Sequence, residues 1–144
     1  MTWWRLFLYL LCFSFTRLQA QSDTLITYSG LKYIITTPGQ GIFPVASRST
    51  VWVHYVGKLR NGLIFDTSSL TGRPIKVRLG RNEVISAWEE ILPKMQLGTK
   101  ITLISPAKLA YGPQGLASDI AGEYKIPPNQ DLIFEMELVK IKTR

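Results

Sequence analysis

One segment of this chain has the apolar spacing of an amphipathic helix, in a sequence that otherwise favours strands. Between Asn82 and Leu92 the apolar residues fall on one helical face: Val84, Ile85, Trp88, Ile91 and Leu92. Asn82 suits the N-cap, Glu83 suits the positive first turn, and Pro93 predicts the end of the helix. Because so short a helix is unstable alone in water, we expect the neighbouring strands to wrap around it.

Runs of β-branched and alternating residues on both sides of this segment predict the strands. They lie at 31–36, 50–59, 63–67, 74–80, 100–106 and 131–142. Asn61-Gly62 between two of these runs is a strong hairpin signal. In the last run, Val139 and Ile141 compete for the inner face. The connections are too short for parallel crossovers, so the sequence predicts an α+β fold: an antiparallel, five- to six-stranded half-barrel sheet around one short helix.

The first twenty residues have the pattern of a secretory signal peptide. A basic start leads into the apolar run 6–15, and the segment ends on the small residue Ala20. An uncleaved anchor is the alternative, although ten apolar residues are few for a bilayer span. We therefore expect a signal peptide at 1–20, a short tether at 21–30 and one domain at 31–144. The expected location is the periplasm or the medium, or the secretory pathway and endoplasmic reticulum lumen if the source is eukaryotic.

The composition of the mature chain excludes several kinds of chemistry. Removing residues 1–20 removes the only cysteine and two arginines, so 17 basic residues become 15 against 10 acidic ones, a net charge of +5. His54 is the only histidine, which excludes an imidazole–thiolate metal site and favours a structural strand histidine over a catalytic base. The glycines form no phosphate-binding loop. Since the basic residues are dispersed, we expect no nucleic-acid partner, no cofactor and no membrane span in the mature chain.

Several short motifs follow one another in an order that is typical of one family. Taken singly, the aromatic residues within them fit ordinary core packing. The motifs are VHYVG (53–57), FDTS (65–68), LG (79–80), EVI (83–85), WEE (88–90), AYG (110–112), IPPN (126–129) and LIFEMEL (132–138). In this order the chain resembles the FKBP-type peptidyl-prolyl cis-trans isomerases over residues 30–142. The segment 106–113 is most similar to exported bacterial members, including the macrophage infectivity potentiator group, here without the N-terminal dimerisation arm.

The resemblance implies a proline pocket between the sheet and the helix. It implies catalytic roles for Asp66 and Tyr111, although Asp66 also fits a plain turn residue at a strand end. The Ile85 amide and the Tyr111 hydroxyl would bind peptide carbonyls, and Trp88 would form an exposed floor. The substrate-binding residues implied are Tyr55, Phe65, Val84, Ile85, Trp88, Ile126 and Phe134. The implied ligands are proline-containing polypeptides and rapamycin-like macrolides, bound by a monomer.

The chain also departs from the family pattern. Ile75 and Val77 stand where many members have pocket phenylalanines, which predicts a wider and less aromatic cavity. Thr71 stands where an arginine partner of Asp66 is frequent, so Arg73 either replaces it or the ion pair is missing. The loop 113–126 is longer than in the smallest members, which makes Ile120 a competitor of Ile126. Two functions stay open: a folding isomerase for exported proteins, or a chaperone or adaptor that binds proline-containing segments with little catalysis.

Overall fold

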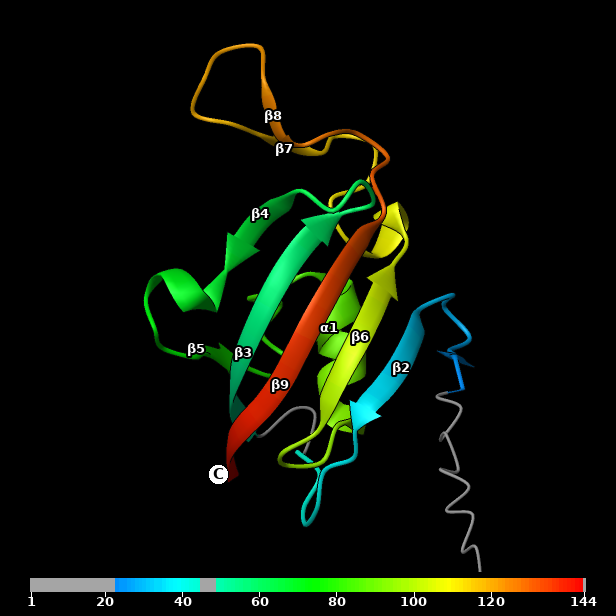
Figure 1. The fold of residues 1–144 in the computed structure, drawn as a ribbon, viewed down its shortest axis with the longest axis vertical. Coiled ribbons are helices and arrows are strands. Elements are labelled where there is room, and N and C mark those ends of the chain that lie inside the picture. The colour runs from blue at the N-terminus through cyan, green and yellow to red at the C-terminus, as the bar shows by residue number, and fades with distance from the viewer. Residues whose placement is uncertain (1–22, 45–48, 144) are drawn as a thin grey trace, which may run out of the picture.

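An antiparallel sheet bends around one short helix in the computed structural model, which describes residues 23–44 and 49–143 (Figure 1). The strand order is β1-β2-β6-β9-β3-β4, and β5 pairs with β3 beside β4. The predicted signal peptide at 1–20 lies outside the described residues. The strands of this sheet are β1 (Leu25–Ile26), β2 (Lys32–Thr37), β3 (Ser49–Leu59), β4 (Ile64–Thr67), β5 (Ile75–Arg78), β6 (Lys100–Ser105) and β9 (Leu132–Thr143). Six of them match the predicted strands, so the α+β antiparallel prediction is confirmed.

The two longest strands, β3 and β9, form the centre of the sheet. Val53 pairs with Leu138 but Trp52 pairs with Lys140, so Val139 is the extra residue of a β-bulge. After the bulge the alternation changes phase, and Ile141 packs against the core opposite the buried Val51. Because of the bulge, Ile141 rather than Val139 lies on the inner face of the sheet.

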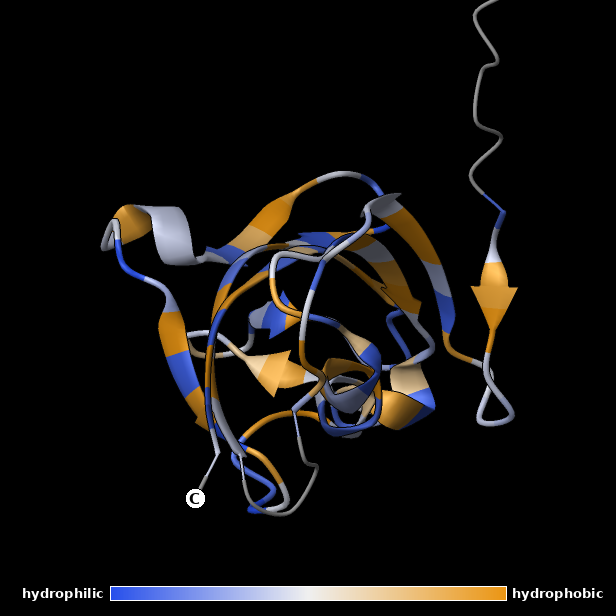
Figure 2. Cartoon of the chain, turned by 90° about the horizontal axis from the view of Figure 1, so that it is seen from below, coloured by the Kyte–Doolittle hydropathy of each residue, from blue (hydrophilic) through white to orange (hydrophobic). Residues whose placement is uncertain are grey.

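The core fills the space between the concave face of the sheet and the helix α1 (Ser86–Ile91). Figure 2 shows apolar stretches along the strands that curve over the helix. Ile91 and Leu92 on the helical side, and Leu103 and Leu138 on the sheet, have no exposed side-chain surface. In the described part of the chain, no helix is long and apolar enough to cross a membrane.

The start of the helix differs from the prediction. The helix begins at Ser86, and Asn82 has a left-handed backbone with φ of 54°, so Asn82 is not the N-cap. Glu83 lies outside the helix and binds Arg78. Glu89 is the acidic residue of the first turn, and its carboxylate accepts the N–H groups of Gly80 and Asn82 at 2.8 and 3.0 Å. The prediction was wrong because this carboxylate holds residues 80–82 in a loop that precedes the helix.

The predicted tether at 21–30 and the long connection between β6 and β9 both contain regular structure. Residues 25–26 of the predicted tether pair with β2, and the Ser29 hydroxyl donates to Glu90 on the helix at 2.6 Å. After α1 the chain continues as a 3₁₀ turn, η2 (Leu92–Lys94), and a 3₁₀ turn of the same length, η1 (Ser68–Leu70), follows β4. The long connection between β6 and β9, which includes the predicted loop 113–126, contains η3 (Ala107–Leu109) and a hairpin of β7 (Leu116–Ala117) and β8 (Tyr124–Ile126).

The predicted hairpin at Asn61-Gly62 is present, with a wider turn than a two-residue loop. The Leu59 N–H donates to the Leu63 carbonyl at 2.9 Å, and only Gly62 of the pair has positive φ, at 88°. The Asn61 side chain accepts the Leu63 N–H instead. The turn thus uses the glycine for its backbone and the asparagine for its side chain.

Candidate active site

A cavity of about 220 Å³ opens between the concave face of the sheet and the N-terminal end of α1. Eight of the nine predicted site residues line it, together with Ile75 and Glu83. The strands β3, β4 and β9, the loop before α1, and the segment after η3 all contribute side chains. The eight residues are Tyr55, Phe65, Asp66, Val84, Ile85, Trp88, Tyr111 and Phe134.

Aromatic rings form the base of the cavity. Tyr55 and Phe134 meet the Trp88 ring edge to face, with centroids 5.0 and 5.4 Å away. Phe65 meets Phe134 in the same manner at 5.9 Å. Trp88 is only 3% exposed, so the prediction of an exposed floor is wrong: the ring is a buried base whose position its neighbours fix.

Gly57 on β3 makes room for two of these rings. A Cβ atom there would lie 2.7 Å from Cζ of Phe65 and 3.2 Å from Cε1 of Phe134. Any side chain at this position would displace one or both rings. The glycine of the VHYVG motif therefore shapes the wall of the cavity.

Asp66 and Tyr55 form the polar edge of the cavity. The Tyr55 hydroxyl donates to Oδ2 of Asp66 at 2.7 Å, and Oδ1 accepts the Thr67 N–H at 2.9 Å. Burial, and then this hydrogen bond, raise the pKa of Tyr55 well above the ordinary value for tyrosine. Within the described part of the chain Arg73 forms no ion pair with Asp66, so Tyr55 is the partner of this carboxylate.

Thr67 and Ser68 hold the backbone of Tyr55, and sequence reasoning missed this role. The Thr67 hydroxyl donates to the Tyr55 carbonyl at 3.0 Å, and the Tyr55 N–H donates to Oγ of Ser68 at 3.0 Å. The buried Ser68 also contacts Nδ1 of His54 at 3.1 Å. Three consecutive residues, 66–68, thus fix one tyrosine, and the polar run at the end of a strand was the available signal.

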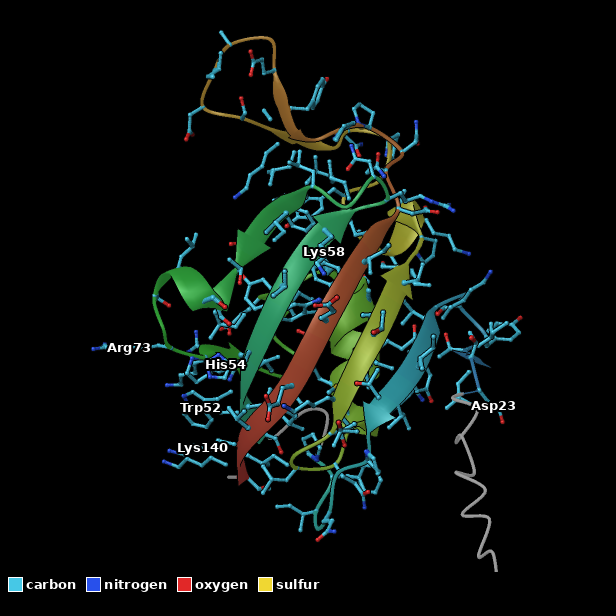
Figure 3. The ribbon with its side chains drawn as sticks, viewed as in Figure 1. Asp23, Trp52, His54, Lys58, Arg73 and Lys140 are labelled. Carbon is cyan, nitrogen blue, oxygen red and sulfur yellow. The ribbon has the colours of Figure 1, made fainter. Side chains whose placement is uncertain are left out.

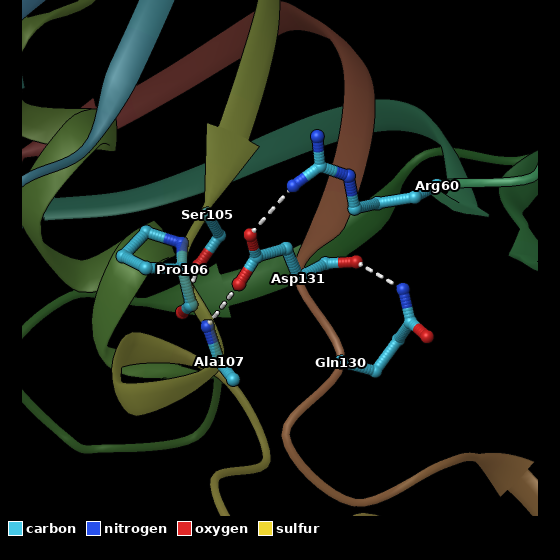
Figure 4. A network of polar contacts seen from close by, with 6 residues as sticks. All are labelled: Arg60, Ser105, Pro106, Ala107, Gln130 and Asp131. Carbon is cyan, nitrogen blue, oxygen red and sulfur yellow. Dashed lines mark hydrogen bonds and ion pairs between the residues drawn. The ribbon is translucent and has the colours of Figure 1, made fainter.

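Tyr111 reaches the cavity from a segment that Asp131 anchors. At the start of β9, the Asp131 carboxylate accepts the Ala107 N–H at 3.0 Å and binds Arg60 at 3.2 Å (Figure 4). The Gly112 N–H closes the turn onto the Ala107 carbonyl at 2.8 Å. Burial, and then the charge of Asp66, raise the pKa of Tyr111, so its hydroxyl stays protonated at neutral pH.

Some hydrogen-bond donors of the cavity-lining residues have no acceptor in the described part of the chain. They include the Tyr111 hydroxyl, the Ile85 N–H and the buried Nε1 of Trp88. Unpaired donors beside an apolar cavity are costly unless a ligand or water completes them. The arrangement therefore suits a ligand with an apolar ring and carbonyl oxygens near it.

Some predicted positions lie elsewhere. Ile126 has no exposed surface and lies in β8, outside the lining, and its competitor Ile120 is 61% exposed in the hairpin loop. Of the two aliphatic replacements, Ile75 lines the cavity while Val77 is buried in the core. Glu83 was missed as a lining residue, since its pairing with Arg78 depends on the loop before the helix.

The cavity offers aromatic surface and hydrogen-bond donors. Among residues 23–44 and 49–143, no three histidine, cysteine or carboxylate side chains gather as metal ligands. The single histidine lies on the opposite face of β3, at a more open hollow of about 450 Å³ that polar residues line together with Val56, Ile101 and Met136. The cavity can bind, desolvate and orient a ligand, and can donate hydrogen bonds to it.

Comparisons with known proteins agree with this geometry. The family model "FKBP-type peptidyl-prolyl cis-trans isomerase" matches residues 44–139. A probable FKBP-type isomerase of Haemophilus influenzae is 38% identical over 122 residues, covering 85% of this chain and 47% of that protein. FK506-binding protein 1 of Saccharomyces cerevisiae is 37% identical over 105 residues, covering 73% of this chain and 87% of that protein.

A solved structure gives the same fold. The isomerase from Pseudomonas syringae superposes with a TM-score of 0.73 at 34% identity, covering 86% of this chain and 84% of that one. The chain spans about half the length of the Haemophilus relative and most of the length of the yeast one. By its sequence, fold and cavity, the chain belongs to the FKBP-type peptidyl-prolyl cis-trans isomerase family.

Proposed function

We propose that this chain catalyses cis-trans isomerisation of Xaa-Pro bonds in polypeptides that are exported with it. One observation carries the catalytic part: an aromatic cavity whose edge presents two unpaired donors, the Tyr111 hydroxyl and the Ile85 N–H. A proline ring fits against the Trp88 base, and the carbonyls beside it can accept these donors. The family membership supports the same reaction.

The reaction needs no acid, base or nucleophile. Rotation about an Xaa-Pro bond faces a barrier of about 18–20 kcal/mol because the twisted amide loses resonance. A millionfold acceleration requires the site to prefer the twisted amide by about 8 kcal/mol. Removal of water from the planar amide and fixed donors at the turning carbonyl can supply such a preference.

The residues divide this work between them. Trp88, Phe65 and Phe134 exclude water around the proline ring, and Ile85 fixes the peptide backbone. The hydrogen bond between Tyr55 and Asp66 forms the polar edge of the cavity, and Thr67 and Ser68 hold the Tyr55 backbone in place. The Tyr111 hydroxyl donates to the carbonyl that rotates.

A proline-isomerisation assay on a short Leu-Pro peptide tests the catalytic proposal. We expect the wild type to accelerate the reaction well above background and Tyr111→Phe to be slower. Tyr28→Phe is the matched control, because Tyr28 is fully exposed and lies outside the cavity. A wild type no faster than background would exclude the enzyme.

Binding without turnover is the signature of the alternative, an adaptor or chaperone. The aliphatic Ile75 in the cavity wall is the feature that favours it. Titration with rapamycin, followed by quenching of tryptophan fluorescence, measures binding separately from turnover. Saturable binding together with background turnover would replace the enzyme proposal with the adaptor.

The export part rests on residues 1–20. Expression of the full chain in a bacterium, followed by fractionation and N-terminal sequencing, should give a periplasmic product that begins at Gln21. A variant with Leu10→Arg and Leu11→Arg interrupts the apolar run and should stay in the cytosol with its N-terminus intact. An unprocessed cytosolic wild type would contradict export. Sedimentation of the processed chain tests the expected monomer.

A further inference from the structure

The convex face of the sheet, which faces away from α1, has two halves of different charge. In one half the lysines are neutralised: Lys58 pairs with Glu135 at 2.6 Å and Lys100 with Glu137 at 3.2 Å. In the other half, Trp52 lies between Lys76 and Lys140, whose ammonium nitrogens are 6.0 and 4.5 Å from the ring centre. Neither of these two lysines has a carboxylate partner in the described part of the chain.

The register of three strands creates this second half. Trp52 on β3 is the direct partner of Lys76 on β5 and of Lys140 on β9. Lys142 follows two residues after Lys140 and is exposed on the same face. Figure 3 shows Trp52 and Lys140 projecting together at this edge of the sheet. We call Trp52, Lys76, Lys140 and Lys142 the Trp52 patch.

The Trp52 patch is basic and aromatic and lies on an open face of the sheet. None of its residues lines the active-site cavity or the hollow beside His54. It has one ring rather than the series of rings on which single-stranded nucleic acid stacks. Its cations are lysines, which act as point charges toward phosphates rather than as bidentate forks.

We propose that the Trp52 patch binds the surface of an anionic phospholipid bilayer. Lysines near such a surface are attracted by the anionic headgroups, and an indole flanked by them prefers the headgroup layer. The cavity lies on the concave face, so contact through the convex face leaves it open to polypeptides. This inference is independent of catalysis and holds for any anionic leaflet.

Vesicle binding by the full chain tests the inference. The measurement is the ratio of binding to vesicles of equal parts phosphatidylcholine and phosphatidylglycerol over binding to phosphatidylcholine alone. The apolar run at 6–15 is common to all variants, so the ratio reports the electrostatic part. Lys76→Gln with Lys140→Gln should lower it about 30-fold, or about fivefold for each lysine.

The matched control removes the same charge elsewhere. Lys94 at the end of η2 and Lys125 in β8 are exposed lysines outside the patch. Lys94→Gln with Lys125→Gln should lower the ratio by less than about twofold, because the effect of a charge fades within a Debye length. An equal loss in both double variants would overturn the proposal in favour of net charge alone.

Footprinting of the unaltered protein gives a second readout. Acylation of Lys76 and Lys140 should slow when anionic vesicles are added, while Lys94 and Lys125 react as before. Polyglutamate, added in place of vesicles, is the probe for the alternative partner, an acidic polypeptide. Protection of the patch by polyglutamate with none by vesicles would assign it to acidic polypeptides and overturn the bilayer proposal.

Discussion

The two faces of β3 and β9 differ in how their polar side chains are paired. On the convex face His54 contacts Ser68, and Lys58 and Glu135 neutralise each other. On the concave face the rings of Tyr55 and Phe134 surround Trp88, whose indole N–H has no acceptor in the described part of the chain. These four convex side chains are paired within the protein, whereas the buried indole N–H of the concave face is unpaired. A buried donor without an acceptor beside an aromatic cavity indicates a binding site on the concave face.

Removal of a tryptophan from each face tests this contrast most strongly. Trp88→Ala should lower the free energy of unfolding by about 3–5 kcal/mol, because it leaves a cavity beneath the two rings packed against it, Tyr55 and Phe134. Trp52→Ala on the convex face should cost only about 1 kcal/mol, the value of an exposed cation–π contact. Urea denaturation of both variants gives the comparison. Similar losses for the two would show that Trp88 is not the packed base described above.

Two tyrosines of the cavity separate stability from activity. Tyr55→Phe breaks a hydrogen bond to a carboxylate and should cost about 1.5 kcal/mol of folding free energy. Tyr111→Phe removes a hydroxyl without a partner, so stability should change by less than about 0.5 kcal/mol. Its kcat/KM should nevertheless fall about tenfold, which is about 1.4 kcal/mol in the transition state. A Tyr111→Phe variant with full activity would remove the proposed donor from the mechanism.

Much of the fold was readable because alternation and periodicity are local signals. The six main strands, the helix stripe and the inward face of β5 follow from apolar spacing alone. The helix start was misplaced because Glu89 binds the backbone of the loop before it, a contact across seven to nine residues. The change of phase between Leu138 and Ile141 was visible in the sequence, but the bulge at Val139 that resolves it depends on pairing between distant strands.

The site was readable chiefly through the family resemblance, since packing and binding aromatics look alike in a sequence. Eight of the nine residues meet at one cavity. Ile126 lies outside the cavity lining, because it is buried in β8, where it pairs with β7. The hydrogen bonds of Thr67 and Ser68 to the Tyr55 backbone were missed, because serine and threonine at a strand end ordinarily indicate a turn.

Alkaline pH should reduce the contribution that Tyr55 on the concave face makes to the free energy of unfolding. The raised pKa of Tyr55 means that, above about pH 10, the unfolded chain loses this proton before the folded chain does. The stability that Tyr55 contributes is then fully present below pH 10. It declines above pH 10 by at most about 1.4 kcal/mol per pH unit, and by less after solvent screening. The advantage of wild type over Tyr55→Phe should therefore shrink between about pH 9 and 11. An advantage that stays constant across this range would contradict the stated origin of the shift.

The smallest effect is expected from the convex ion pair of Lys58 and Glu135. These side chains are 27% and 54% exposed, so water and salt screen their attraction. A double-mutant cycle with Lys58→Gln and Glu135→Gln should give a coupling of about 0.2–1 kcal/mol, which falls as salt is added. Isomerase activity should not change in any corner of the cycle, because neither residue lines the cavity. A coupling as large as the cost of Tyr55→Phe, or an activity change, would mean that the charges of the convex face support the cavity, and the two faces would no longer be independent.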